Sequence, residues 1–96
     1  MKPGKTYAVS DLLKSIFKDK KFEEGLLSAQ IKREWSDIVG LKVASATGGM
    51  WVRERVLFVE VKSSIIRSEL KLISADLVKS INRRMGEDAI TDLIVR

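Results

Sequence analysis

The stretch VLFVEVKSSIIRSEL, residues 56–70, decides the fold because it joins a strand directly to a helix. Alternating apolar residues between Leu57 and Val61 are typical of a strand with one buried face. Ser63 and Ser64 follow as candidate helix N-caps, and the apolar residues then recur at helical spacing. The change of period indicates a strand that leads straight into a helix.

The helix that follows is predicted to run for about 20 residues and to end at Gly86. Its apolar residues recur at spacings of four, three, four and four: Ile66, Leu70, Ile73, Leu77 and Ile81. Small and basic residues are expected on its outer side: Ser68, Lys71, Ala75, Lys79 and Asn82.

Three strands are expected around this helix. Residues 50–53 and 56–62 should pair as a hairpin around Glu54-Arg55. Thr47-Gly48-Gly49 is expected to break the preceding helical period and to form a turn into the first strand. A last strand is predicted from Ile90 to Val95, and the helical crossover before it should place it parallel to the second strand.

Two helices are predicted before the hairpin. Ser10 is a candidate N-cap for a first helix over about residues 10–19. A second helix should run from Phe22 to near Gly40. Its stripe of Leu27, Ile31, Trp35 and Ile38 predicts that Trp35 is buried rather than a stacking residue. Gly40 should either end that helix in a left-handed conformation or permit a close backbone crossing.

The expected fold class is therefore α+β, with the order α-α-β-β-α-β and a three-stranded mixed sheet whose helices pack on one face. We expect residues 1–9 to form a flexible N-terminal tail and residues 10–96 to form a single domain. On the uncovered sheet face, Phe58 and either Trp51 or Val52 should point outward.

The composition narrows the class of function. The chain has 96 residues, of which 45% are hydrophobic and 32% charged, as expected of a globular domain. It has no cysteine and no histidine, so the usual ligands of structural zinc and the usual neutral-pH base are missing. We expect no enzyme activity, no cofactor and no metal. No apolar run is long enough to cross a membrane, and we expect a cytoplasmic protein.

The net charge of +5 is unevenly distributed. Residues 1–21 and residues 62–84 each carry six cations and two anions. Such segments can bind nucleic acid through its phosphates, although a solvated helix face is an equal alternative. The candidate nucleic-acid-binding residues are Lys14, Lys18, Lys20, Lys21, Lys62, Arg67, Lys71, Lys79, Arg83 and Arg84. Trp51 and Phe58 are candidates for stacking on bases.

Several features in the same order resemble the DciA-type domain family. They are Trp35 followed by Ile38-Val39-Gly40, then Ala44 and Thr47, a hairpin ending in LFVEVKSSIIRSEL, a helix with INRRMG and a terminal LIVR. The resemblance extends from about Ser10 to Arg96.

The resemblance implies a KH-like fold and a role in bacterial DNA replication, where such proteins associate with the replicative helicase DnaB and help to place it on DNA. It therefore implies DNA and the replicative helicase as partners, and no membrane. The chain departs from KH domains in lacking a Gly-x-x-Gly loop, so their clamp on the nucleic-acid backbone is not expected here. Almost nothing lies beyond the domain, so a helicase contact made by an extension in longer relatives is not expected either.

Three alternatives remain open. Similar proteins have been described as RNA-binding, so RNA is one alternative ligand. A protein-interaction domain could use the open sheet face or the edge of the last strand. The open face could also support a homodimer.

Overall fold

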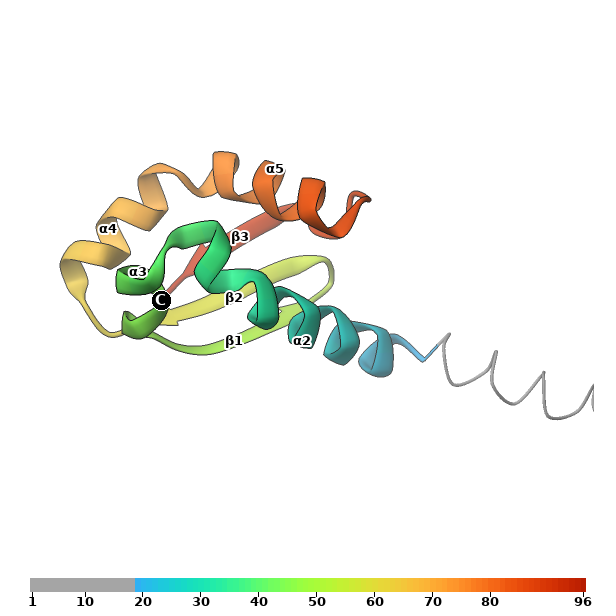
Figure 1. Cartoon of the computed structure of the whole chain (residues 1–96). Coiled ribbons are helices and arrows are strands. Elements are labelled where there is room, and N and C mark those ends of the chain that lie inside the picture. Colours follow the sequence, from blue (N-terminus) through green and yellow to red (C-terminus); the bar gives the residue numbers. More distant parts are fainter. Residues whose placement is uncertain (1–18) are drawn as a thin grey trace, which may run out of the picture.

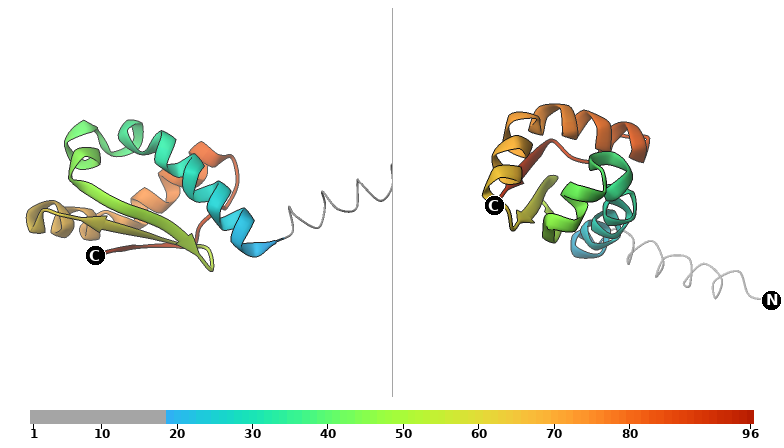
Figure 2. Two further views of the ribbon diagram at one scale, coloured as in Figure 1. Left: turned by 90° about the horizontal axis from the view of Figure 1, so that it is seen from below. Right: turned by 60° about the vertical axis from the view of Figure 1, so that its left-hand side comes forward.

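The structure is a computed structural model, and it describes residues 19–96. A three-stranded sheet has the order β1 (Thr47–Arg53), β2 (Val56–Val61) and β3 (Asp92–Val95), with β1 antiparallel and β3 parallel to β2. The helices arch over one side of the sheet and leave the other side uncovered (Figures 1 and 2). The α+β fold with a mixed sheet and helices on one face is therefore confirmed. The elements are α2 (Lys20–Val39), α3 (Leu41–Ala46), β1 (Thr47–Arg53), β2 (Val56–Val61), α4 (Ser64–Leu72), α5 (Ser74–Met85) and β3 (Asp92–Val95).

The second predicted helix is confirmed as α2. The Asp19 carboxylate accepts a hydrogen bond from Phe22 N at 3.1 Å and caps its first turn. Ile31 and Trp35 are buried, and Leu27 and Ile38 pack partly buried against the core, as the stripe predicted. The flexible tail and the first helix, predicted over residues 1–9 and 10–19, lie outside the described residues except for Asp19.

Gly40 separates α2 from α3, a short helix that the sequence did not predict. Gly40 ends α2 at a positive φ of 91°, as predicted, but its ψ of 159° lies outside the left-handed helical region. A β-carbon built on Gly40 would meet no atom of residues 19–96 within 4 Å, so the alternative of a close crossing is wrong. Gly40 redirects the chain, and α3 then leads to the sheet.

The hairpin is confirmed, but its first strand is longer than predicted. Gly48 and Gly49 lie within β1 rather than in a turn before it, and the pairing register shifts between Thr47 and Met50. The turn is formed by Glu54 and Arg55, as predicted. Both have positive φ, 52° and 64°, as a two-residue hairpin turn prefers, although neither is glycine.

The single long helix predicted after β2 is wrong, because it is broken at Ile73 into α4 and α5. Ile73 has a φ of −108° and a ψ of 15°, which lie outside the helix, and its side chain is 45% exposed rather than buried. The break lets α4 pack on β2 and β3 while α5 packs on β3 and α2. Ser63 caps α4 by accepting from Ile66 N, and Gly86 ends α5 in the left-handed conformation, as predicted.

Asn82 was expected on the outer side of this helix, and that prediction is wrong. Its side chain is half-buried and hydrogen-bonds to the backbone of Ile90. Ile90 itself is buried but precedes β3, which begins two residues later than predicted. The amide of Asn82 therefore tethers the loop between α5 and β3.

One hydrophobic core joins the helices to the covered face of the sheet. Its fully buried side chains include Ile31, Leu57, Val59, Ile81 and Ile90. Trp35 is 3% exposed, and its indole Nε1 donates to Thr47 Oγ1 at 2.9 Å. The Thr47 hydroxyl in turn donates to Val43 O at 2.8 Å. Trp35 is thus confirmed as a buried corner, where it connects α2, α3 and β1.

Candidate nucleic-acid interface

The uncovered sheet face carries an apolar row that crosses all three strands. Trp51 of β1 is opposite Phe58 of β2, and Phe58 is opposite Ile94 of β3. The two rings are stacked, with centroids 5.4 Å apart and planes 9° from parallel. Trp51 and Phe58 are half-buried and Ile94 is 39% exposed, whereas Val52 is buried on the other face. Of the two residues expected to accompany Phe58, it is therefore Trp51 that faces outward.

A guanidinium group lies over this stack. Cζ of Arg96 is 5.1 Å from the centroid of the Phe58 ring and 5.9 Å from that of the Trp51 ring. Both distances are in the range of a cation–π interaction. The backbone of Arg96 places it there, since its N–H donates to Val59 O and its C=O accepts from Val61 N.

Three further cations lie beside the row. Lys62 and Arg96 line a shallow hollow of about 320 Å³ together with Glu60. Lys21 and Arg53 line a second hollow of about 310 Å³ next to Trp51. Aromatic rings flanked by cations are the combination that single-stranded nucleic acid requires, because bases stack and phosphates are neutralised.

The predicted basic residues of the helices lie elsewhere. α5 packs on the sheet through Leu77 and Ile81, so Lys79 and Arg83 lie on its exposed side, away from the open sheet face. They share a depression of about 400 Å³ with Glu87 and Asp88, whose carboxylates oppose the positive potential. The structure therefore divides the predicted cations between opposite sides of the domain.

Three predicted site residues make contacts within the protein: Lys20, Arg84 and Arg67. Lys20 Nζ contacts both carboxylate oxygens of Glu54 at 2.6 Å. Arg84 Nη1 is 3.1 Å from Glu34 Oε1 and 3.6 Å from Asp37 Oδ2.

The third of these residues, Arg67, serves the junction between β2 and α4. Its Nη2 donates to Val61 O at 3.0 Å, and its Nε is buried without a hydrogen-bond partner among residues 19–96. Lys62 and Lys71 are exposed, and Lys14 and Lys18 lie outside the described residues. Lys20, Arg67 and Arg84 are therefore less available to a ligand than Lys21 and Lys62.

Arg53 and Arg96 are not among the site residues predicted from the sequence. Arg53 lies two residues after Trp51 in the same strand, and this alternation could have placed it on the same face. Arg96 comes beside Phe58 only because β3 is parallel to β2, and no local pattern at the end of the chain signals that contact.

Metal and membrane sites have no support within residues 19–96. That part of the chain contains no cluster of three acidic side chains arranged to hold a metal ion. It also contains no helix with the length and apolar character that a membrane span requires.

The geometry defines a small α+β domain built on a three-stranded mixed sheet, with an aromatic, cation-flanked face left open. The family model described as "Dna[CI] antecedent, DciA" matches residues 8–95. The chain belongs to the DciA family, and membership implies a role in helicase loading during DNA replication. No curated protein and no solved structure matched the chain in the same comparisons.

Proposed function

We propose that the protein is a non-enzymatic accessory factor of bacterial DNA replication that acts in the cytoplasm, binds single-stranded DNA and contacts the replicative helicase. Family membership supports the replication role and the helicase partner. The stacked Trp51 and Phe58 on the uncovered sheet face carry the DNA-binding part of the proposal. A KH-like relationship remains a prediction from the resemblance.

Binding at this face requires Arg96 to move from the rings to a phosphate. An exposed cation–π contact contributes about 0.5–1 kcal/mol of stabilisation, whereas stacking a base on an aromatic side chain contributes about 1–3 kcal/mol. The exchange is therefore favourable, and the released guanidinium gains a phosphate contact. Arg53, Lys62 and Lys21 supply further charge along the same face.

The helix-borne cations form a second proposed contact. Lys79 and Arg83, with Lys71 on α4, are exposed on the helical side and can neutralise phosphates there. Their contribution should be smaller than that of the open face, because Glu87 and Asp88 share the α5 depression.

The proposal is tested by capture of the replicative helicase with the tagged protein, before and after nuclease treatment. Recovery of the helicase after nuclease treatment supports a direct contact. Loss of the helicase with the nucleic acid would mean that DNA alone bridges the two proteins. Titration of fluorescent single-stranded DNA and of RNA of the same sequence then separates DNA binding from RNA binding, because only RNA offers the 2′-hydroxyl.

Self-association is tested on the same face. If the row of Trp51, Phe58 and Ile94 pairs with a second copy, sedimentation velocity will show a dimer that single-stranded DNA dissociates. A monomer at all concentrations is the expected result, because half-buried rings beneath a guanidinium leave little apolar area to bury.

A further inference from the structure

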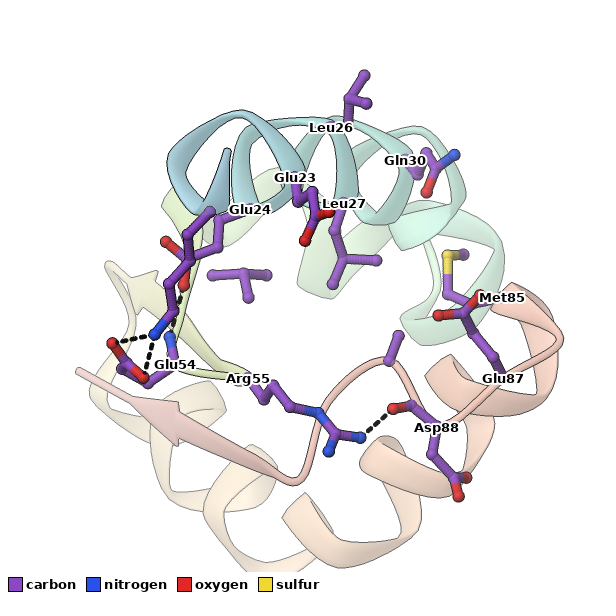
Figure 3. A pocket seen from close by; sticks show the side chains of 13 residues that line it. Glu23, Glu24, Leu26, Leu27, Gln30, Glu54, Arg55, Met85, Glu87 and Asp88 are labelled. Carbon is purple, nitrogen blue, oxygen red and sulfur yellow. Dashed lines mark hydrogen bonds and ion pairs between the residues drawn. The ribbon is translucent and has the colours of Figure 1, made fainter. Parts of the chain in front are cut away.

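A groove opens at the end of the domain where α2 begins. It lies between the first half of α2, the turn between β1 and β2, and the loop after α5, and it has a volume of about 760 Å³ (Figure 3). Its apolar lining includes Leu26, Leu27, Val52 and Met85. Leu27 points into the groove, whereas Leu26, which is 44% exposed, lies at the rim and points outward (Figure 3).

The rim of this groove is acidic although the protein is basic. Five carboxylates line it, from Glu23, Glu24, Glu54, Glu87 and Asp88. Among residues 19–96, only Lys20 and Arg55 of the lining oppose them, so this described rim carries a net charge of −3 in a chain of net charge +5.

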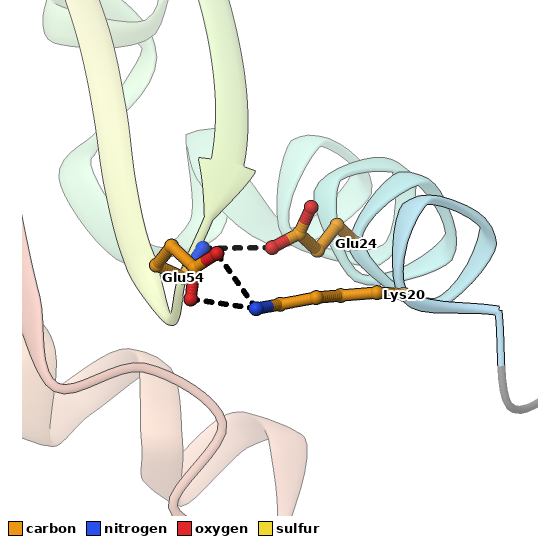
Figure 4. Close-up of polar contacts among 3 residues, drawn as sticks. All are labelled: Lys20, Glu24 and Glu54. Atoms are coloured by element: carbon orange, nitrogen blue, oxygen red, sulfur yellow. Dashed lines mark hydrogen bonds and ion pairs between the residues drawn. The ribbon is translucent and has the colours of Figure 1, made fainter.

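Both cations of the rim are already engaged. Lys20 bridges to Glu54 (Figure 4), and the Arg55 guanidinium donates to the backbone carbonyl of Asp88. The carboxylates of Glu23 and Glu87 make no ion pair or hydrogen bond among residues 19–96. Among the described residues, the groove lining therefore has an excess of carboxylates above an apolar floor, and two of these carboxylates, Glu87 and Asp88, also face the depression that holds Lys79 and Arg83.

The adjacent sheet edge is closed to a further strand. Ser28 Oγ accepts from Val52 N at 2.9 Å, and Glu24 Oε2 accepts from Glu54 N at 2.7 Å. Backbone groups that an added strand would need are thus occupied by side chains of α2. A ligand here must satisfy its own backbone hydrogen bonds, as a helix does.

We propose that this groove binds a basic amphipathic helix of a protein partner. The apolar side of that helix would cover Leu26, Leu27 and Met85, and its lysines or arginines would meet Glu23 and Glu87. Nucleic acid is disfavoured because phosphates would be repelled by the rim. The inference goes beyond the proposed function, since it adds a protein-binding site at a place separate from the DNA-binding face.

The experiment uses the full chain and a fluorescent Leu/Lys peptide of about 14 residues, which forms roughly four helical turns. Fluorescence anisotropy measures its dissociation constant. A Leu/Glu peptide with the same apolar face is the control for charge. We expect saturable binding of the Leu/Lys peptide and none of the Leu/Glu peptide.

The informative variant is the charge reversal Glu23→Lys with Glu87→Lys. Its matched control is Glu69→Lys with Asp76→Lys, which makes the same change in net charge on exposed positions of α4 and α5. Glu23 and Asp76 both lie in the first turn of a helix, so both variants lose the same favourable interaction with a helix dipole. The groove variant should weaken peptide binding by about tenfold, and the control should leave it unchanged.

A second control tests non-specific apolar binding. The most exposed large apolar side chains of α4 are Ile65 and Leu72, at 71% and 86%, and they lie outside the groove. Ile65→Ser with Leu72→Ser should not change binding, whereas Leu26→Ser should weaken it several-fold. Thermal unfolding of each variant confirms that the fold is retained.

Four results would overturn the proposal. The first is that the Leu/Lys peptide shows no saturable binding, and the second is that the two charge-reversal variants lose peptide affinity equally. The third is a loss of affinity confined to the Ile65/Leu72 variant, and the fourth is tighter binding of a peptide of residues 8–18 with the same dependence on Glu23 and Glu87. The last result would make the chain's own segment the occupant. Failure of DNA binding is a separate outcome, because the groove variant should bind single-stranded DNA at least as well as the parent.

Discussion

Asn82 and Ile90 are joined by two hydrogen bonds, since Nδ2 of Asn82 donates to Ile90 O and Oδ1 accepts from Ile90 N, both at 2.9 Å. The side-chain amide thereby satisfies the backbone N–H and C=O of Ile90, which a neighbouring strand would otherwise do. Ile90 is 1% exposed, so water cannot replace these bonds.

Replacing Asn82 by alanine should therefore destabilise the protein. Two buried backbone groups would lose their partners, at about 1–3 kcal/mol for each unsatisfied group. We expect the free energy of unfolding, measured with urea, to fall by about 2–6 kcal/mol. Lys79→Ala on the exposed side of the same helix is the control. An unchanged midpoint for Asn82→Ala would contradict the role assigned to this amide.

Trp35 should contribute to stability through both its ring and its indole N–H. Trp35→Ala should cost about 3–5 kcal/mol, because it leaves a cavity in the core. Trp35→Phe keeps most of the ring but loses the bond to Thr47 Oγ1, and should cost about 1 kcal/mol from that bond, in addition to lost packing. We expect the melting temperature to be highest for the parent, lower for Trp35→Phe and lowest for Trp35→Ala. Equal melting temperatures for the parent and Trp35→Ala would refute the burial of this residue.

Trp51 offers a direct optical test of the DNA-binding face. In a Trp35→Phe background it is the one remaining tryptophan of the chain. Saturation with oligothymidine should quench its fluorescence, because a base replaces the guanidinium over the ring. Trp51→Leu with Phe58→Leu should weaken DNA binding by about 10–100-fold at constant salt. Unchanged emission at a DNA concentration that saturates anisotropy would place the binding site elsewhere.

The two groups of cations can be separated by their salt dependence. Arg53→Gln with Lys62→Gln removes two charges from the open face, and the slope of log K against log salt should fall by about 1.4 for a single strand. Lys79→Gln with Arg83→Gln removes two charges from the helical side and should change the slope less. If the second variant lowers the slope more than the first, the main phosphate contacts lie on α5.

The Lys20–Glu54 pair predicts a pH effect at the alkaline end. The hydrogen bond to Glu54 raises the pKa of Lys20 above its ordinary value of 10.5, and the charges of Glu54 and Glu24 add to this effect. A raised pKa in the folded state means that the contribution to stability is fully present below pH 10.5 and is lost as the pH rises through the folded value.

A double-mutant cycle of Lys20→Met and Glu54→Gln measures this contribution. The coupling should be present near neutral pH, should disappear above the folded pKa of Lys20, and should weaken with salt because both side chains are exposed. A coupling that grows with pH would contradict the assignment.

The elements with a strong period could be predicted from the sequence, and their interruptions could not. The stripe of α2 and the alternation of β2 identified both elements, because each buries one face against the same core. Ile73 continued a perfect helical stripe, yet the chain breaks there so that α4 and α5 can each reach a different part of the fold. The contacts that hold the two helices in place, those of α4 with β3 and of α5 with α2, are between elements far apart in the sequence, so no local pattern signals the break.

The candidate site, like the fold, could be predicted only in part from the sequence. Phe58 could be placed on the open face because alternation decides which face a strand residue occupies, but the sequence left open whether Trp51 or Val52 lies beside it. The position of Arg96 over their rings depends on the register between β2 and β3, which no local pattern encodes. The acidic groove combines residues from α2, the hairpin turn and the loop after α5, so composition along the chain gave no sign of it.

The tip of the hairpin should order late in folding. Glu54 and Arg55 adopt a left-handed backbone that costs about 1–2 kcal/mol per residue without glycine, so an isolated hairpin would not close in this form. The bonds that hold the tip reach Lys20, Glu24, Asp88 and Thr91, all of them 30 or more positions away. The hairpin is therefore a poor folding nucleus. Its turn should close only after α2 and the loop before β3 have packed against the sheet.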